Sequence, residues 1–285
     1  MKIRVLPYKG TNLSEVRPAF FLKAFGEKVY DMRIFSFGRC NYACPYCKRD
    51  GYDKNNLDIE GSVEIDEEEI FRAVDDAIAK GQVIRLSGGD PVCYPNLSLR
   101  ILKYAKEKGG ITSIAHNGSG PEFVAKLAPY LDFASIDFKA SSFEQLGQIA
   151  GIDREMARKC FANTIRTIKI LQEQGIYTDV RTCVFDDTSY EQLIKIAELF
   201  QGEDSSNLFW TLRTYSPIDS FDKKAKTPEE MTEMGTKISE KIKNLRIGIR
   251  AKWEPGGFQY FYGGEKVEKF PTTRRRLDGG RPIDE

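Results

Sequence analysis

The 285-residue chain has almost no net charge and a single histidine, His116. Lys and Arg number 43 and Asp and Glu number 42, which gives a formal net charge of +1. Domains that bind nucleic acids commonly carry a clear basic excess. The charge balance therefore argues against a nucleic-acid partner.

The chain also lacks long apolar runs. None approaches the roughly 20 residues that a helix needs to cross a bilayer. Residues 1–10, MKIRVLPYKG, lack the continuous apolar stretch of a signal peptide. We therefore expect no membrane association and a cytoplasmic location, where thiols stay reduced. In that setting the six cysteines indicate metal ligands or reactive groups rather than disulfides.

Strand and helix patterns alternate along most of the chain. In the helix expected over 66–80, Ile70, Val74 and Ala77 recur at helical spacing behind an acidic first turn. A second helix is expected over 154–175. The strands are expected at 30–38, 83–87, 111–117, 132–139, 178–185, 208–215 and 245–251. This alternation predicts an α/β fold with a parallel sheet, either a complete or partial barrel or a doubly wound open sheet.

Unusual residues fall where these strands end. Cysteines follow the first strand, Gly88-Gly89-Asp90 follows the second, Asn117-Gly118 ends the third, and Asp137 and Lys139 end the fourth. Because barrel enzymes place their chemistry at the carboxyl ends of the strands, we expect these groups to meet at one rim.

The cysteine loop reads Cys-Asn-Tyr-Ala-Cys-Pro-Tyr-Cys, with thiols at Cys40, Cys44 and Cys47. Thiolates are the usual ligands of iron–sulfur clusters. Three of them hold three irons of a cubane cluster and leave the fourth iron open to a ligand. The spacing therefore favours a [4Fe–4S] cluster.

A structural zinc site and a chance grouping of buried cysteines are the alternatives. Structural zinc usually takes four nitrogen or sulfur ligands. A second Cys-x-x-Cys pair is absent, and the other cysteines, Cys93, Cys160 and Cys183, are scattered. A non-catalytic zinc or iron–sulfur binding module would explain the cysteines but not the polar strand ends.

Taken together, these segments resemble the radical S-adenosylmethionine (SAM) superfamily. The Cys-x3-Cys-x2-Cys spacing with an aromatic residue before the last cysteine looks like its signature. Residues 87–91 resemble its Gly-Gly-Glu-Pro segment, and 116–118 resemble its Thr-Asn-Gly segment. Residues 136–139 resemble the Asp-x-Lys segment of glycyl-radical-enzyme activating proteins.

The resemblance implies a partial (β/α)6 barrel with short N-terminal and C-terminal extensions. We expect one domain over 1–285, with a core at about 30–215 and an extension over 216–285 that closes the barrel. SAM would chelate the open iron, and one electron from the cluster would release a 5′-deoxyadenosyl radical that takes hydrogen from a substrate. The expected SAM-binding residues are Tyr46, Ser87, Gly88, Gly89, Asp90, His116, Asn117, Asp137, Lys139 and Arg181.

The sequence also departs from the family pattern. Asp90 replaces the usual Glu and is one methylene shorter, so either the loop approaches more closely or backbone carbonyls take over the SAM amino group. His116 stands where Thr is common, and it is expected either to act as an acid, base or adenine contact or to be a hydrogen-bonded structural residue. Lys48-Arg49 replaces the His-Asn of many activating proteins.

Strand alternation predicts a lumen rich in arginine. It turns Arg85, Asp179 and Arg213 inward, together with Ser87, Ser135, Asp137, Lys139, Arg181, Cys183, Thr211, Arg246 and Arg250. Guanidinium groups suit carboxylates and phosphates, so Arg181 is expected at the SAM carboxylate or ribose and Arg213 at an anionic substrate. Internal ion pairs with Asp137 and Asp179 are the alternative. Cys183 is a candidate hydrogen-atom donor, although a buried Cys is more often core.

Two subclasses of substrate stay open. The Asp-x-Lys segment favours an activating enzyme for a glycyl-radical enzyme, whereas the arginines favour a small anionic metabolite or a peptide. Either reaction needs an electron donor such as flavodoxin or ferredoxin. The aromatic and glycine-rich tail over 253–264 is expected to cover the barrel mouth or to pack as an edge strand.

Overall fold

The computed structural model describes residues 1–6, 16–18, 30–47, 58–200, 207–215, 221–252 and 257–270. The helices are α2 (Glu67–Ala79), α3 (Pro95–Glu107), α4 (Pro121–Leu127), α5 (Phe143–Ala150), α6 (Arg154–Glu173), α7 (Tyr190–Phe200) and α8 (Pro228–Lys241), with 3₁₀ turns η1 (Pro91–Cys93) and η2 (Ala128–Tyr130). The strands are β1 (Lys2–Val5), β2 (Val16–Pro18), β3 (Asp31–Phe37), β4 (Val63–Asp66), β5 (Val83–Gly88), β6 (Thr112–His116), β7 (Phe133–Asp137), β8 (Tyr177–Val184), β9 (Leu208–Thr214), β10 (Arg246–Arg250), β11 (Phe258–Tyr262) and β12 (Glu265–Val267). The predicted strands and the two predicted helices are confirmed to within two residues at each end.

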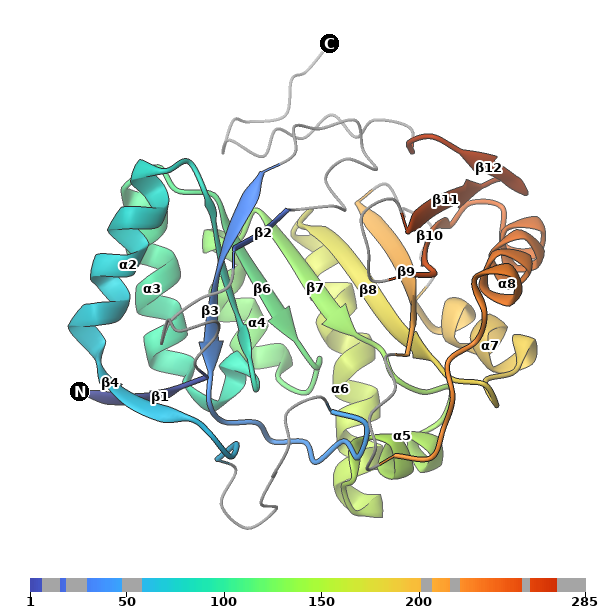
Figure 1. Cartoon of the computed structure of the whole chain (residues 1–285), viewed down its shortest axis with the longest axis horizontal. Helices are drawn as coiled ribbons and strands as arrows, with labels where there is room; N and C mark the ends of the chain where they lie inside the picture. Colours follow the sequence, from blue (N-terminus) through green and yellow to red (C-terminus); the bar gives the residue numbers. More distant parts are fainter. Residues whose placement is uncertain are drawn as a thin grey trace.

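One sheet contains all of these strands, in the order β12-β11-β10-β9-β8-β7-β6-β5-β3-β1-β4, with β2 paired to β3. From β3 to β10 every neighbouring pair is parallel. The order follows the chain without reversal, whereas a doubly wound sheet reverses at a switch point. The strand path has two ends, so the described sheet is a partial barrel, and Figure 1 shows the helices along its outer side.

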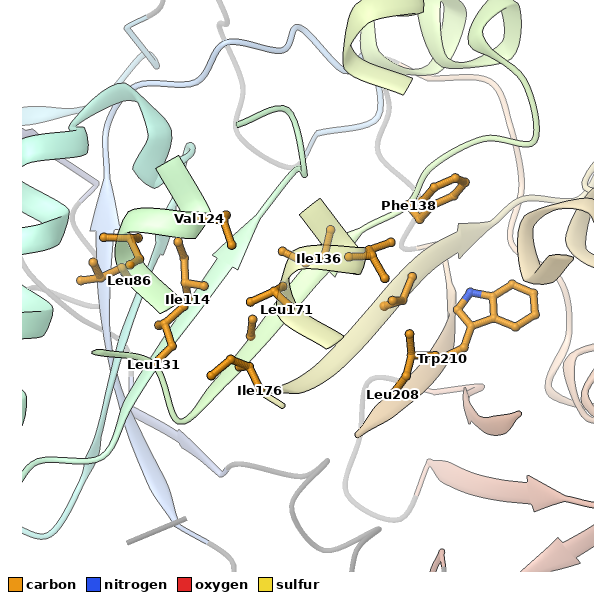
Figure 2. Packing of buried hydrophobic residues seen from close by; sticks show 14 of the residues in the cluster. Leu86, Ile114, Val124, Leu131, Ile136, Phe138, Leu171, Ile176, Leu208 and Trp210 are labelled. Atoms are coloured by element: carbon orange, nitrogen blue, oxygen red, sulfur yellow. The ribbon is translucent and has the colours of Figure 1, made fainter. Parts of the chain in front are cut away.

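The main core lies between the outer face of the sheet and the helices. Figure 2 shows Ile136 of β7 near Leu171 of α6, Trp210 of β9 beside Leu208, and Val124 of α4 beside Ile114 of β6. These are the outward positions of the strand alternation. Burying each such side chain stabilises the fold by roughly 1.5–3 kcal/mol. Because side chains alternate along a strand, packing the apolar residues against the helices turns the polar residues between them toward the lumen.

Antiparallel strands extend the sheet at both ends. β1 pairs with β3 and β4, and β11 pairs with β10 and β12. The extension begins with α8, where Thr227 and Glu230 cap the helix reciprocally: the Thr227 hydroxyl accepts from the Glu230 N–H at 3.2 Å and the Glu230 carboxylate accepts from the Thr227 N–H at 2.7 Å. The part of the tail at 258–262 is strand β11, which lies inside the sheet between β10 and β12, while 253–256 and 271–285 lie outside the described residues.

A second apolar cluster lies on the lumen face, at the amino ends of the strands. Its members come from the barrel strands and from the extension: Met32, Ile34, Val83, Phe133, Tyr177, Phe209, Tyr260 and Phe270. The lumen therefore has an apolar floor and polar walls above it. No helix of the described residues has the length and apolar character needed to cross a membrane.

Candidate active site

A cavity of about 470 Å³ opens at the carboxyl ends of the strands. Every residue that the sequence predicted for the site lines it: Cys40, Cys44, Tyr46, Cys47, Ser87, Gly88, Gly89, Asp90, His116, Asn117, Asp137, Lys139, Arg181, Cys183 and Arg213. Ser135, Asp179, Thr211 and Arg250 also line the cavity as strand alternation predicts. Arg246 occupies the same face of β10 but pairs in register with Phe209 at the floor and is not part of this lining.

The cysteine loop is fixed from one side by the end of α5. The Ala43 N–H donates to the Ala150 carbonyl at 2.8 Å. Gly151, with φ at +61°, lies directly against the Ala43 carbonyl, and a Cβ there would collide with that oxygen. Within the loop, the Tyr42 N–H points at Cys40 Sγ at 3.4 Å. The loop therefore has a defined path before any metal binds.

The donor set of this loop fits an iron–sulfur cluster. Burial raises the pKa of Cys40 well above its ordinary value and that of Cys44 to about 11, so both are thiols that would lose a proton on binding metal. Among the described residues no three His, Cys, Asp or Glu side chains are grouped to hold one metal ion. In a cubane cluster each thiolate binds a different iron, so its three ligands need not converge on one ion.

The glycine pair at the end of β5 lies against the start of this loop. The Gly89 N–H donates to the Phe37 carbonyl and the Asp90 N–H to the Arg39 carbonyl, both at 2.6 Å. Gly88 has φ at +105°, and a Cβ on either glycine would collide with backbone atoms of Phe37 or Arg39. The two backbones can pack this closely only because neither residue has a side chain.

Asp90 uses its carboxylate within the chain. It is 2% exposed. Oδ1 accepts from the Val92 N–H at 2.9 Å and lies 2.7 Å from His116 Nδ1, while Oδ2 accepts from the Asn117 N–H at 2.8 Å. The carboxylate therefore ties the 3₁₀ turn after the glycine pair to the end of β6.

These contacts determine the tautomer of His116. Its Nε2 accepts from the Gly120 N–H at 3.1 Å, so the ring proton resides on Nδ1 and is donated to Asp90. Both ring nitrogens are engaged, and the side chain is 1% exposed. Of the two roles considered for His116, this arrangement supports the structural one.

The side chain of Asn117 is also engaged within the chain. Its Nδ2 donates to Asn41 Oδ1 at 2.7 Å, and its Oδ1 accepts from the Ser119 N–H at 3.0 Å. Asn41 in turn donates to Ser119 Oγ at 2.9 Å. Asn41 was not among the residues predicted for the site, although its place beside Cys40 in a loop of expected metal ligands is a signal that points to it.

On the opposite wall, Lys139 joins the cysteine loop to β7. Its Nζ donates to the Tyr46 hydroxyl at 3.2 Å and to Asp137 Oδ2 at 3.1 Å. Tyr46 packs edge-on against Phe185, with ring centroids 5.1 Å apart. An aromatic wall thus adjoins the last cysteine of the loop.

Asp137 is the shared acid of the lumen. Its Oδ1 lies 2.8 Å from Arg181 Nη2 and 3.7 Å from Arg213 Nη2, in addition to the Lys139 contact. Burial alone would raise the pKa of Asp137, but Arg181, Lys139 and Arg213 together hold it well below its ordinary value. The internal network that the sequence offered as an alternative is therefore present around Arg213, which makes the loosest of the three contacts.

Arg85 and Asp179 lie deeper. Arg85 donates from Nη1 to Ser113 Oγ at 2.8 Å, and burial lowers its pKa to about 9. Asp179 accepts from the Thr211 hydroxyl at 2.5 Å, and burial raises its pKa.

The three cysteines outside the loop differ in position. Burial raises the pKa of Cys183 to about 11, so the thiol form faces the cavity. Cys160 is buried in an apolar cluster with Tyr42. Cys93 is half-buried at the end of η1, outside the cavity lining.

Other lining residues gave no clear signal in the sequence. Met32 and Ile34 of β3, Thr214 and Tyr215 after β9, and Phe258 of β11 line the cavity. Phe258 comes from β11 of the extension, a segment for which the sequence predicted only a cover over the barrel mouth or an edge strand. Lys48-Arg49, the departure noted after the last cysteine, lies outside the described residues.

Comparison with known proteins decides the family. Residues 34–200, more than half of the chain, match the family described as the radical SAM superfamily. The chain belongs to the radical SAM superfamily. It is therefore an enzyme, and members of this superfamily generally use SAM with a [4Fe–4S] cluster.

The chain is similar in sequence to two proteins from Methanocaldococcus jannaschii that have different names. One, provisionally named a glycyl-radical enzyme activating enzyme, is 28% identical over 227 residues, covering 75% of this chain and 87% of that protein. The other, a 7-carboxy-7-deazaguanine synthase, is 30% identical over 190 residues, covering 62% of this chain and 74% of that protein.

The fold of the radical SAM enzyme is shared with solved structures. A radical SAM methyltransferase from Sphaerobacter thermophilus aligns with a TM-score of 0.61 at 12% identity, covering 94% of this chain and 81% of that one. At this identity the likeness concerns the fold, and it confirms the α/β, partial-barrel prediction.

Proposed function

We propose that this enzyme binds one [4Fe–4S] cluster through Cys40, Cys44 and Cys47, cleaves SAM reductively, and removes a hydrogen atom from a substrate held in the lumen. The single observation that supports this most directly is the shared cavity. The cysteine loop, the glycine pair and the charged lumen wall all line it, so a radical formed at the rim meets a substrate on the wall.

When bound, the cluster and SAM supply the 5′-deoxyadenosyl radical that takes the hydrogen atom. The chain's own contribution is position. Gly88 and Gly89 line the cavity, and because they lack side chains the end of β5 can pack directly against the backbone of Phe37 and Arg39. Asp90 holds the 3₁₀ turn and Asn117 in place. On this proposal it supports the SAM site through the backbone and does not contact SAM itself. Its side chain is one methylene shorter than that of the family's usual Glu, which agrees with such an indirect role.

Lys139, Tyr46 and Arg181 form the other side of the proposed SAM site. Tyr46 offers an aromatic face beside Cys47, and Arg181 offers a guanidinium for the SAM carboxylate or ribose. The electron would come from reduced flavodoxin or ferredoxin. The thiol of Cys183 faces the same space and is a second hydrogen-atom source for a substrate radical.

Anaerobic reconstitution followed by reduction with dithionite tests the proposal. We expect slow formation of 5′-deoxyadenosine from SAM without any added substrate. Formation of S-adenosylhomocysteine and a methylated product, with no deoxyadenosine, would contradict it. A matched control is the unreconstituted protein with the same reductant, which should be inactive.

Activation of a glycyl-radical enzyme is a second candidate for the substrate. It is favoured by the relative that carries this provisional name and by the Asp137-x-Lys139 segment. In that case the reduced enzyme and SAM should generate a glycyl-radical signal, detected by electron paramagnetic resonance, on a glycyl-radical protein encoded beside it. A glycine-to-alanine variant of that partner would be the control.

A further inference from the structure

The lumen holds more positive than negative side chains among the described residues. Arg85, Arg181, Arg213 and Lys139 line it, and the carboxylates that face them are Asp137 and Asp179. Asp90 also lines the cavity, but its carboxylate is engaged by His116 and by backbone N–H groups. The cations therefore outnumber the acids available to them.

Arg85 is the cation that these acids leave without an ion pair. It is 6% exposed. Within the described chain its contacts are the hydrogen bond to Ser113 and a position 6.0 Å from the centre of the Phe133 ring, and no carboxylate lies within ion-pair distance. A guanidinium has five N–H donors, so most of those of Arg85 have no protein partner here.

The neighbouring Arg181 shows the same imbalance. Nη2 meets Asp137, but the buried Nε has no hydrogen-bond partner among the described residues. Arg181 and Arg213 also lie close enough to Arg85 to lower its pKa further. Burying like charges side by side is costly unless an anion joins them.

The cofactors of the proposed function do not correct the imbalance. A net negative charge on a thiolate-bound cluster is matched by the net positive charge of SAM, and the one SAM carboxylate has Arg181 and the rim available to it. Arg85 lies two residues before Ser87 on β5, below the glycine turn, next to the apolar floor formed by Met32, Ile34 and Phe133.

We propose that Arg85, with Arg213 on the far wall, binds a carboxylate of a small-molecule substrate at the base of the lumen. The inference rests on the proposed function and names its substrate class. The apolar floor would contact the carbon skeleton, while the Ser113 hydroxyl holds Nη1 of Arg85 and leaves the other N–H groups of this guanidinium for the carboxylate. The rest of the substrate would then extend upward toward the rim, where the hydrogen atom is removed.

The test uses the reconstituted enzyme under anaerobic conditions with saturating SAM, so that the SAM carboxylate is already accommodated. The melting temperature is followed during titration with succinate, with inorganic phosphate, and with sodium chloride at matched ionic strength. We expect succinate to raise the melting temperature, since a ligand that binds only the folded state stabilises it, and chloride to leave it unchanged. A response to phosphate alone would overturn the carboxylate assignment. The succinate titration is repeated without SAM, and a response seen only when SAM is left out would assign the site to SAM itself.

Arg85→Met and Arg33→Met form a matched pair. Arg33 lies on the adjacent strand, one register position away, and is ion-paired to Asp76 at 2.8 Å outside the cavity. Without anion, Arg85→Met should melt about 2–4 °C above the parent because an uncompensated buried charge is removed, and its succinate response should be lost. Arg33→Met should keep the response.

A lower melting temperature for Arg85→Met together with an unchanged succinate response would overturn the inference and make Arg85 structural. Deoxyadenosine formation is measured on the same preparations. If the parent enzyme forms none, the proposed function fails. If it forms deoxyadenosine but shows no succinate response, only the carboxylate site fails.

Discussion

The rim around Asp90 and the deep lumen around Arg85 are both buried and polar, but they differ in how completely their groups are paired. At the rim, both oxygens of Asp90, both ring nitrogens of His116 and both ends of the Asn117 amide have partners inside the chain. In the lumen, no acid of the described residues lies within ion-pair distance of Arg85. A fully paired network keeps the geometry of a site fixed, whereas buried charge without a partner indicates a site where a ligand of opposite charge binds.

The cysteines belong to the rim, and their loss should have the largest effect. Replacing Cys40, Cys44 or Cys47 by Ala removes one of three ligands, so iron and sulfide should fall well below the roughly four of each expected per chain. Iron and sulfide analysis after anaerobic reconstitution measures this. Cys93→Ala is the control, because that thiol lies outside the cavity lining, and it should keep its cluster. Stoichiometric zinc without sulfide in the parent would end the cluster assignment.

Asp137→Asn should be the most destabilising change in the lumen. It leaves Arg181, Lys139 and Arg213 without their shared carboxylate, which should lower the free energy of unfolding by about 3–5 kcal/mol. The pKa of Asp137 is depressed in the folded state, so its stabilisation is complete above the unfolded value of about 4 and is lost as the pH falls below it. Urea unfolding at pH 7 and below pH 4 measures both effects, and the two proteins should converge in acid. An equal difference at both pH values would contradict the charge assignment.

Asp90→Ala should weaken the rim. Three buried donors lose their acceptor, so the free energy of unfolding should fall by about 3 kcal/mol or more. The KM for SAM should rise with the iron content unchanged, because the turn that follows the glycine pair loses its anchor. Asp90→Glu restores the family's usual residue, but its longer side chain has to enter a fully packed site, and we expect it to raise the KM as well. Parent-like kinetics for Asp90→Glu would show that the carboxylate reaches SAM directly.

Arg213→Met should have the smallest effect on stability and a selective effect on turnover. Arg213 makes the longest of the Asp137 contacts, 3.7 Å, so the acid keeps Arg181 and Lys139. Loss of a charge-assisted contact worth roughly 1.5–3 kcal/mol should lower kcat/KM for the substrate by about one to two orders of magnitude. A melting-temperature drop with unchanged turnover per folded molecule would reject a substrate role.

The sequence predicted the barrel strands and the lumen face well, because alternation of apolar and polar residues is a local signal. Ile136 and Val180 face the core, and Asp137 and Arg181 face the cavity, as period two requires. It could not supply the partners of Asp90 or the role of Asn41. Apart from the contact between Asp90 and Val92, these contacts join residues separated by 26 to 78 positions, and no local pattern records which of several polar groups will pair.

The backbone contact between the glycine pair and the start of the cysteine loop would link the two proposed cofactor sites thermodynamically. Gly89 and Asp90 hydrogen-bond directly to Phe37 and Arg39, so whatever orders the loop also orders the turn. Binding of the cluster should therefore order the turn in advance, so that SAM binding costs less conformational entropy. Bound SAM should in turn slow the loss of iron. Retention of the cluster under mild oxidation would then depend on the concentration of SAM.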